Sequence, residues 1–121
     1  MSARSLGPYT PVVPAGPWLI VSGQVGARDG ALVPGGVAAQ TEQAVANLAS
    51  LLAEHGASLA DVVKTTVFMT DIANFATINE AYMAAFGEHR PARSAVAVVA
   101  LPLGALVEVE AWAFRPGGQP A

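Results

Sequence analysis

Two short apolar runs near the end of the chain, residues 94–100 and 106–114, constrain the fold more than any other feature of the sequence. Both runs are rich in valine and alanine, and the break between them contains Pro102 and Gly104. Short apolar runs that are bounded by turn-forming residues are typical of buried strands. We therefore predict two strands that pair as a hairpin about residues 101–105.

The second of these runs has two chemically different faces. Side chains alternate along a strand, so Glu108, Glu110 and Trp112 share one face while valine and alanine fill the other. A strand of this kind has its apolar face in the core and its carboxylates either in water or in a polar site. The residues alone leave both interpretations open.

The rest of the chain predicts strands that alternate with helices. We expect strands at residues 9–13 and 18–22, with prolines placing the first at a sheet edge, and a turn at Arg28-Asp29-Gly30. Apolar residues at helical spacing predict a helix over residues 37–55 that is closed by Gly56. A β-branched run at residues 62–69 predicts a central strand. Apolar residues that form one stripe at helical spacing and end before Gly87 predict a second helix.

This order, ββαβαββ, indicates an α+β fold in which two helices pack on one face of a single mixed sheet. The length of 121 residues indicates one domain, residues 1–121, with residues 1–7 and 115–121 loose. Charged residues make up 12% of the chain and apolar residues 53%, against about 25% and 45–50% in soluble proteins generally. Because so little charge leaves apolar surface to be covered between subunits, we expect an oligomer.

Several classes of function are disfavoured. The chain has no cysteine, so it has no disulfide framework and no thiol nucleophile, which fits a cytoplasmic protein. Prolines interrupt the uncharged segment 5–27, which therefore looks like neither a signal peptide nor a membrane span. The net charge of −3 and the scattered basic residues argue against nucleic acid as a partner. His55 and His89 lack metal-ligand spacing, and no nucleotide-binding glycine loop is present, so we expect neither a metal nor a cofactor.

Separate motifs along nearly the whole chain resemble, in order, those of the reactive intermediate deaminase family (RidA, formerly YjgF). The C-terminal motifs are Pro91-Ala92-Arg93-Ser94, Leu101-Pro102 and Val107-Glu108-Val109-Glu110-Ala111. The upstream motifs are Gly7-Pro8-Tyr9, Ser22-Gly23-Gln24, Val37-Ala38-Ala39-Gln40, Val63-Lys64-Thr65-Thr66-Val67 and Phe75-Ala76-Thr77-Ile78-Asn79 before Tyr82. The resemblance implies a fold like that of bacillary chorismate mutase and a homotrimer.

The resemblance also implies an activity, namely the cofactor-independent hydrolysis of short 2-imino acids to 2-keto acids and ammonia. Arg93 would bind the substrate carboxylate, a task that suits the planar guanidinium fork. Glu108 would position or activate the attacking water, and Glu110 would be structural. The residues that would line the site with Arg93 are Tyr9, Ser22, Gly23 and Ala95.

The chain departs from the family pattern in two places. Many members have a cysteine where this chain has Ala95, which excludes thiol chemistry here. The loop Glu88-His89-Arg90 is shorter than in many members and lacks their aromatic residue beside the proline. These departures favour, as an alternative, a regulatory member that binds small carboxylates without turnover. A third interpretation follows an older family label, endoribonuclease or translation inhibitor, and the acidic charge balance argues against it.

The predicted hairpin has a consequence for the site. It would place Glu108 opposite Val98, five residues or on the order of 16 Å along the strand from Arg93. Two side chains that act on one small substrate cannot be so far apart. We therefore predict that each site is shared, with Arg93 from one subunit and Glu108 from another.

Overall fold

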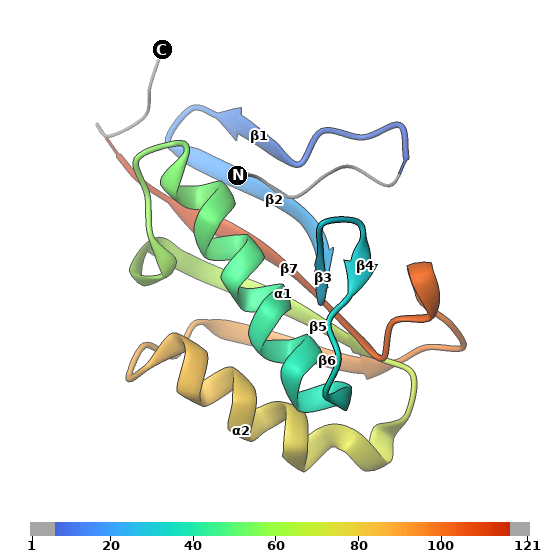
Figure 1. Cartoon of the computed structure of the whole chain (residues 1–121). Helices are drawn as coiled ribbons and strands as arrows, with labels where there is room; N and C mark the ends of the chain where they lie inside the picture. Colours follow the sequence, from blue (N-terminus) through green and yellow to red (C-terminus); the bar gives the residue numbers. More distant parts are fainter. Residues whose placement is uncertain (1–6, 117–121) are drawn as a thin grey trace.

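The computed structural model describes residues 7–116, which form a five-stranded sheet with both long helices on one of its faces (Figure 1). The strands stand side by side in the order β1-β2-β7-β5-β6. Their bounds are β1 (Val12–Ala15), β2 (Trp18–Val25), β5 (Val62–Met69), β6 (Ala92–Ala97) and β7 (Val107–Phe114). The helices are α1 (Gly36–Ala53) and α2 (Phe75–Phe86). The predicted α+β class, a mixed sheet with two helices on one face, is confirmed.

A second, smaller sheet was not predicted. It is a hairpin of β3 (Ala27–Arg28) and β4 (Ala31–Leu32), strands too short for alternation to be visible in the sequence. The predicted turn joins them, and its residues Asp29 and Gly30 have φ values of 56° and 86°. Such positive φ angles are the reason that Asp-Gly pairs favour tight hairpins. Single 3₁₀ turns occupy Leu59–Asp61, Ile72–Asn74 and Pro102–Gly104.

The predicted hairpin of the last two strands is wrong. β5 lies between them, and it pairs in parallel with β6 on one side and antiparallel with β7 on the other. β7 also pairs with β2, so it has a hydrogen-bonded neighbour on each edge. Alternation in β7 determines which side chains face the core, but it carries no information about the partner strand. The connection through Pro102–Gly104 carries the chain past the end of β5 rather than back along β6.

The core lies between the sheet and the helices. On α1 the residues that face it recur at helical spacing, as predicted, and they are Gln40, Thr41, Ala44, Val45, Leu48, Leu51 and Leu52. The helix ends two residues before the predicted limit, because His55 N donates to Leu52 O at 2.9 Å and tightens the last turn. Gly56 follows with a φ of 74°, which is the left-handed conformation expected at the end of a helix.

The opposite face of the sheet is not covered by any helix of the described chain (Figure 1). By strand register it carries Glu108 and Glu110 among large apolar side chains, and those more than a third exposed are Val13, Val96, Trp112 and Phe114. Trp18 packs edge-on against Trp112 and Phe114, at centroid distances of 6.0 and 4.9 Å. An apolar surface of this kind usually marks a contact between subunits.

The segments that were predicted to be loose, residues 1–7 and 115–121, lie mostly outside the described residues. Arg115 is described and is held in place, because its backbone N donates to Pro17 O at 2.7 Å and its side chain lies 3.7 Å from a carboxylate oxygen of Asp61. Within residues 7–116, no helix has both the length and the apolar character needed to cross a bilayer.

Candidate functional site

Glu108 lies in the central strand β7 on the face of the sheet that the helices leave open. Its neighbours Val107 and Val109 point into the core, so alternation directs the carboxylate the other way. Partial burial raises the pKa of Glu108 above its usual range, and the nearby Glu110 carboxylate raises it further. A carboxylate with a raised pKa is a better base than a solvated one, which suits proton transfer near neutral pH.

Gly23 approaches this carboxylate closely. A Cβ atom added at Gly23 would lie 2.6 Å from Oε2 of Glu108, so only glycine leaves room for the carboxylate as it stands. The approach is made by an irregularity in β2, where the pairing with β7 slips between Val21 and Gln24. Bulges of this kind re-aim side chains and are frequent beside functional sites.

Ser22, in the same irregularity, connects the site to the N-terminal segment. Its hydroxyl donates to Thr10 O at 2.7 Å, and its backbone N donates to Pro11 O at 2.8 Å. Tyr9 precedes this anchored segment and is 42% exposed. The structure therefore brings together three of the predicted site residues, Ser22, Gly23 and Glu108, and fixes the segment beside Tyr9.

Arg93 belongs to a different part of the molecule, the edge strand β6. It pairs with Thr65 of β5, a buried residue of the helix-covered face, so the arginine side chain lies on that face. Its guanidinium carbon is 5.6 Å from the ring centroid of Phe75 and 5.0 Å from that of Tyr82, both on α2. Within residues 7–116 the Arg93 side chain makes no hydrogen bond or ion pair, so its donors are available to a ligand.

Asn79 is a candidate that the sequence analysis missed. It lies four residues after Phe75 and three before Tyr82, so it shares the face of α2 that contacts Arg93. Its Oδ1 atom is buried and has no hydrogen-bond partner among the described residues. Native structures rarely leave a buried acceptor unpaired, and such an atom often marks the place of a ligand. The signal in the sequence was the polar residue within the apolar stripe of α2.

Ala95 follows Arg93 by two residues, on the same face of β6. It is partly buried and packs against the hydrophobic core. No group of three or more His, Asp or Glu residues in the described chain is arranged to hold a metal ion.

Arg93 and Glu108 do not meet within one chain. They lie on opposite faces of the sheet, and β5 separates their strands. Arg93 is level with Thr65, whereas Glu108 is level with Phe68, three residues or about 10 Å further along β5. The predicted register, Glu108 opposite Val98, is wrong because the hairpin is absent. Arg93 and Glu108 of one chain are nevertheless far apart, because they lie on opposite faces of the sheet.

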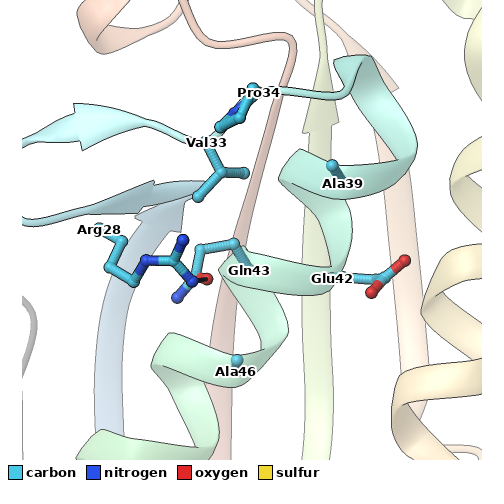
Figure 2. A pocket seen from close by; sticks show the side chains of 7 residues that line it. All are labelled: Arg28, Val33, Pro34, Ala39, Glu42, Gln43 and Ala46. Carbon is cyan, nitrogen blue, oxygen red and sulfur yellow. Dashed lines mark hydrogen bonds between the residues drawn. The ribbon is translucent and has the colours of Figure 1, made fainter.

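The cleft drawn in Figure 2 contains none of the predicted site residues. It has a volume of about 320 Å³ and lies between the β3–β4 hairpin and α1. Two of its lining residues are hydrogen-bonded, since Arg28 Nη1 donates to Gln43 Oε1 at 3.4 Å, and Gln43 Nε2 donates to Asn47 Oδ1 at 2.8 Å. Asn47 Nδ2 in turn donates to the carbonyls of Val25 and Ala27 at 3.1 and 3.0 Å. These hydrogen bonds hold the β3–β4 hairpin against α1, so the polar residues at this cleft have a structural role.

Comparison with known proteins places this geometry in a family. A family model described as endoribonuclease L-PSP matches residues 1–115. A RutC family protein of Pyrococcus abyssi is 41% identical over 114 residues, which cover 93% of this chain and 90% of the relative. The 2-iminobutanoate/2-iminopropanoate deaminase of Mus musculus is 44% identical over 113 residues, which cover 92% of this chain and 84% of the relative.

The same relationship holds in three dimensions. The crystal structure of the YjgF gene product from E. coli superposes with a TM-score of 0.88 at 39% identity, covering 94% of this chain and 93% of the other. Sequence and structure agree over almost the full length of both proteins. The chain therefore belongs to the RidA/YjgF family, which the endoribonuclease L-PSP model describes.

Proposed function

We propose that this protein hydrolyses short 2-imino acids to 2-keto acids and ammonia without a cofactor, at sites shared between the subunits of a homotrimer. The observation that carries the proposal is the guanidinium of Arg93, which is partly buried beside α2 and has no hydrogen-bonding or ionic partner within residues 7–116. An unpaired, partly desolvated guanidinium is suited to binding a small carboxylate through two hydrogen bonds. A curated relative that carries the matching deaminase name supports the same substrate class.

Substrate binding and water activation are assigned to different residues of the site. Arg93 binds the carboxylate of the imino acid, and the unpaired Oδ1 of Asn79 accepts a hydrogen bond from the N–H of the imine. Glu108, supplied by a neighbouring subunit, holds the attacking water against the imine carbon. Tyr9, Ser22 and Gly23 belong to the Glu108 side of this shared site, and Ala95 belongs to the Arg93 side.

The reaction requires one base that takes a proton and then returns it. The water oxygen bonds to the carbon of the protonated imine while Glu108 accepts a proton from that water, and the C=N electron pair moves to nitrogen. Glu108 then returns the proton to the amino group, the C–N bond breaks with its electrons leaving on nitrogen, and the hydroxyl oxygen forms the C=O bond. The hydroxyl proton is taken by the departing ammonia, so the products are a 2-keto acid and ammonium.

Beyond orienting the reactants, the protein supplies one base, Glu108, which accepts a proton and returns it. The substrate is already an electrophile when its nitrogen is protonated, and holding reactants in place contributes much of the acceleration in such reactions. The raised pKa of Glu108 keeps its carboxylate sufficiently basic to accept a proton. No step requires a thiol, which agrees with Ala95 in the position where many members have cysteine.

Turnover of freshly generated 2-iminopropanoate tests the proposal. We expect hydrolysis well above the rate in buffer, and loss of that acceleration in both Arg93→Ala and Glu108→Ala. A non-catalytic member that binds small carboxylates is the second candidate, and Ala95 favours it. Binding of 2-oxobutanoate by calorimetry without any acceleration of imine hydrolysis would establish the second candidate instead of the first.

A further inference from the structure

We propose that Phe75 and Tyr82 are positioning residues that hold the guanidinium of Arg93 against their rings and leave its N–H groups free for the substrate carboxylate. The inference rests on the proposed function, because it gives Arg93 the role of carboxylate ligand. It adds two residues of α2 to the site and explains how an arginine on an edge strand is held without an acidic partner.

Arg93 contacts two aromatic rings of the same helix. Phe75 and Tyr82 are seven residues apart on α2, two turns of one helix face. The guanidinium carbon is 5.6 Å from the Phe75 ring centroid and 5.0 Å from the Tyr82 ring centroid. The arginine is therefore within cation–π distance of both rings at once. Arginine over an aromatic face is attracted by the ring quadrupole.

Tyr82 is itself fixed. Its hydroxyl lies 2.7 Å from Oγ1 of Thr65, which is fully buried in β5, and the Tyr82 side chain is only 4% exposed. Phe86 also packs against the Tyr82 ring, at a centroid distance of 4.6 Å. Because Thr65 is also the strand neighbour of Arg93, one buried residue aligns β6 and α2 at this point.

Holding an arginine by rings has a chemical consequence. An acidic partner would occupy the N–H groups and neutralise the charge, whereas aromatic faces do neither. Contact with aromatic rings leaves the N–H groups of the guanidinium edge unpaired, and that edge is the part that pairs with a carboxylate. The arrangement thus keeps a full positive charge and a free hydrogen-bonding fork in a partly desolvated place.

Two ring deletions and one control test the inference. Phe75→Leu and Tyr82→Leu each remove one ring beside Arg93. Phe86→Leu removes a ring of the same helix that contacts Tyr82 and is not in cation–π contact with the arginine. We expect the dissociation constant for 2-oxobutanoate, measured by calorimetry, to rise about 3- to 30-fold in the first two variants. In Phe86→Leu it should change by less than about twofold. Tyr82→Phe keeps the ring and should restore binding.

In turnover assays the ring deletions should raise KM by a similar factor and leave kcat within about threefold, because the rings act through the binding of the carboxylate. A further readout needs no ligand. The Nε–H proton of Arg93 should be shifted upfield by ring currents in the NMR spectrum of the wild-type protein and of Phe86→Leu, and it should lose part of that shift in Phe75→Leu.

Phe75 is 40% exposed, so Phe75→Leu should fold even if Tyr82→Leu does not. Wild-type affinity and an Nε–H signal that stays at its wild-type position in folded Phe75→Leu would overturn the positioning role while leaving the deaminase proposal intact. Conversely, weaker binding in Phe75→Leu together with no imine turnover by the wild type would reject the deaminase and keep the positioning role. Failure of the wild type to bind 2-oxobutanoate at all would overturn both.

Discussion

Gly23 and Glu108 are in such close contact that a single added carbon on Gly23 would overlap the carboxylate. The contact joins a strand irregularity in β2 to the central strand β7, and the distance from the missing Cβ to Oε2 of Glu108 would be 2.6 Å. Gly23 does not have a positive φ angle, so the backbone itself would accept another residue. The glycine is required by the position of the carboxylate and not by the backbone.

Gly23→Ala is therefore expected to displace the Glu108 carboxylate while the fold is kept. A displacement of about 1 Å in a group that handles the attacking water can cost on the order of 100-fold in rate. The measurement is kcat/KM for imine hydrolysis, together with circular dichroism to verify folding. Gly30→Ala is the control for general destabilisation, because its φ of 86° strains an alanine in the β3–β4 turn while no atom beyond its chain neighbours, and so no catalytic carboxylate, lies within 4 Å of the added Cβ. Equal activity of Gly23→Ala and wild type would show that the carboxylate position is unimportant.

Arg93→Lys should weaken substrate binding although it preserves the positive charge. Lysine has no planar fork, and a hydrogen bond that involves a charged group contributes roughly 1.5–3 kcal/mol, which corresponds to about 10- to 100-fold in affinity. Steady-state kinetics should show this loss in kcat/KM. The matched control is Arg90→Lys, since Arg90 is exposed and, among residues 7–116, its side chain donates to the nearby carbonyls of Gly87 and His89. Indistinguishable kinetics for the two lysine variants would remove Arg93 from the site.

The pH dependence of imine hydrolysis should reflect the protonation of Glu108 on β7. Burial and the Glu110 carboxylate raise the pKa of Glu108, so the basic form is lost at a higher pH than for a solvated glutamate. Activity should therefore decline on the acid side as Glu108 is protonated. Glu110→Gln removes the charge contribution, and the acid limb of kcat/KM should move to lower pH. A pH profile that does not move in Glu110→Gln would contradict this coupling.

The same pKa shift makes a prediction about stability. A carboxyl whose pKa is raised by folding is preferred in its protonated form in the native state, so its ionisation costs stability as the pH rises above the ordinary glutamate value. Glu108→Gln mimics the protonated form and should raise the melting temperature at neutral pH. At a pH below the ordinary value, where both states are protonated, the melting temperatures of variant and wild type should converge. A lower melting temperature for Glu108→Gln at neutral pH would count against the burial of this carboxyl.

The apolar face opposite the helices predicts the oligomeric state. Trp112 and Phe114 are 44% and 40% exposed on that face, and Trp18 packs against both. We expect multi-angle light scattering to give the mass of three chains at micromolar concentration, and Trp112→Glu to reduce it. A monomer mass for the wild type would contradict the proposal of sites shared between subunits.

Much of the fold was predictable because the periodicity of apolar residues reflects which side chains face the core. The spacing on α1 and the alternation on β7 both identify the buried face, and both agree with the structure. Strand pairing was not predictable in the same way. Alternation has the same form whether β7 pairs with β6 or with β5, and the hairpin interpretation failed at that point.

For the candidate site, too, the residues were predictable from the sequence and their placement was not. The residue type and position of Arg93 and Glu108 could be singled out from their motifs, yet their placement on opposite faces depends on the strand order. Phe75, Asn79 and Tyr82 belong to one of the family motifs, but nothing in the sequence indicates that they lie beside Arg93. Their relation to Arg93 arises where α2 crosses over β5 and β6, which is a tertiary contact that no local pattern reports.

The central claim is that Arg93 of one subunit and Glu108 of another form one site, and subunit mixing tests it most directly. Arg93→Ala and Glu108→Ala are each expected to be inactive as pure proteins. When the two are unfolded together in equal amounts and refolded, random reassembly should give about a quarter of the sites both wild-type residues if the subunits form a closed ring. We predict that the refolded mixture, whose mixed trimers are verified by mass spectrometry, regains about that fraction of wild-type activity. Mixed trimers that stay as inactive as either parent would contradict the account.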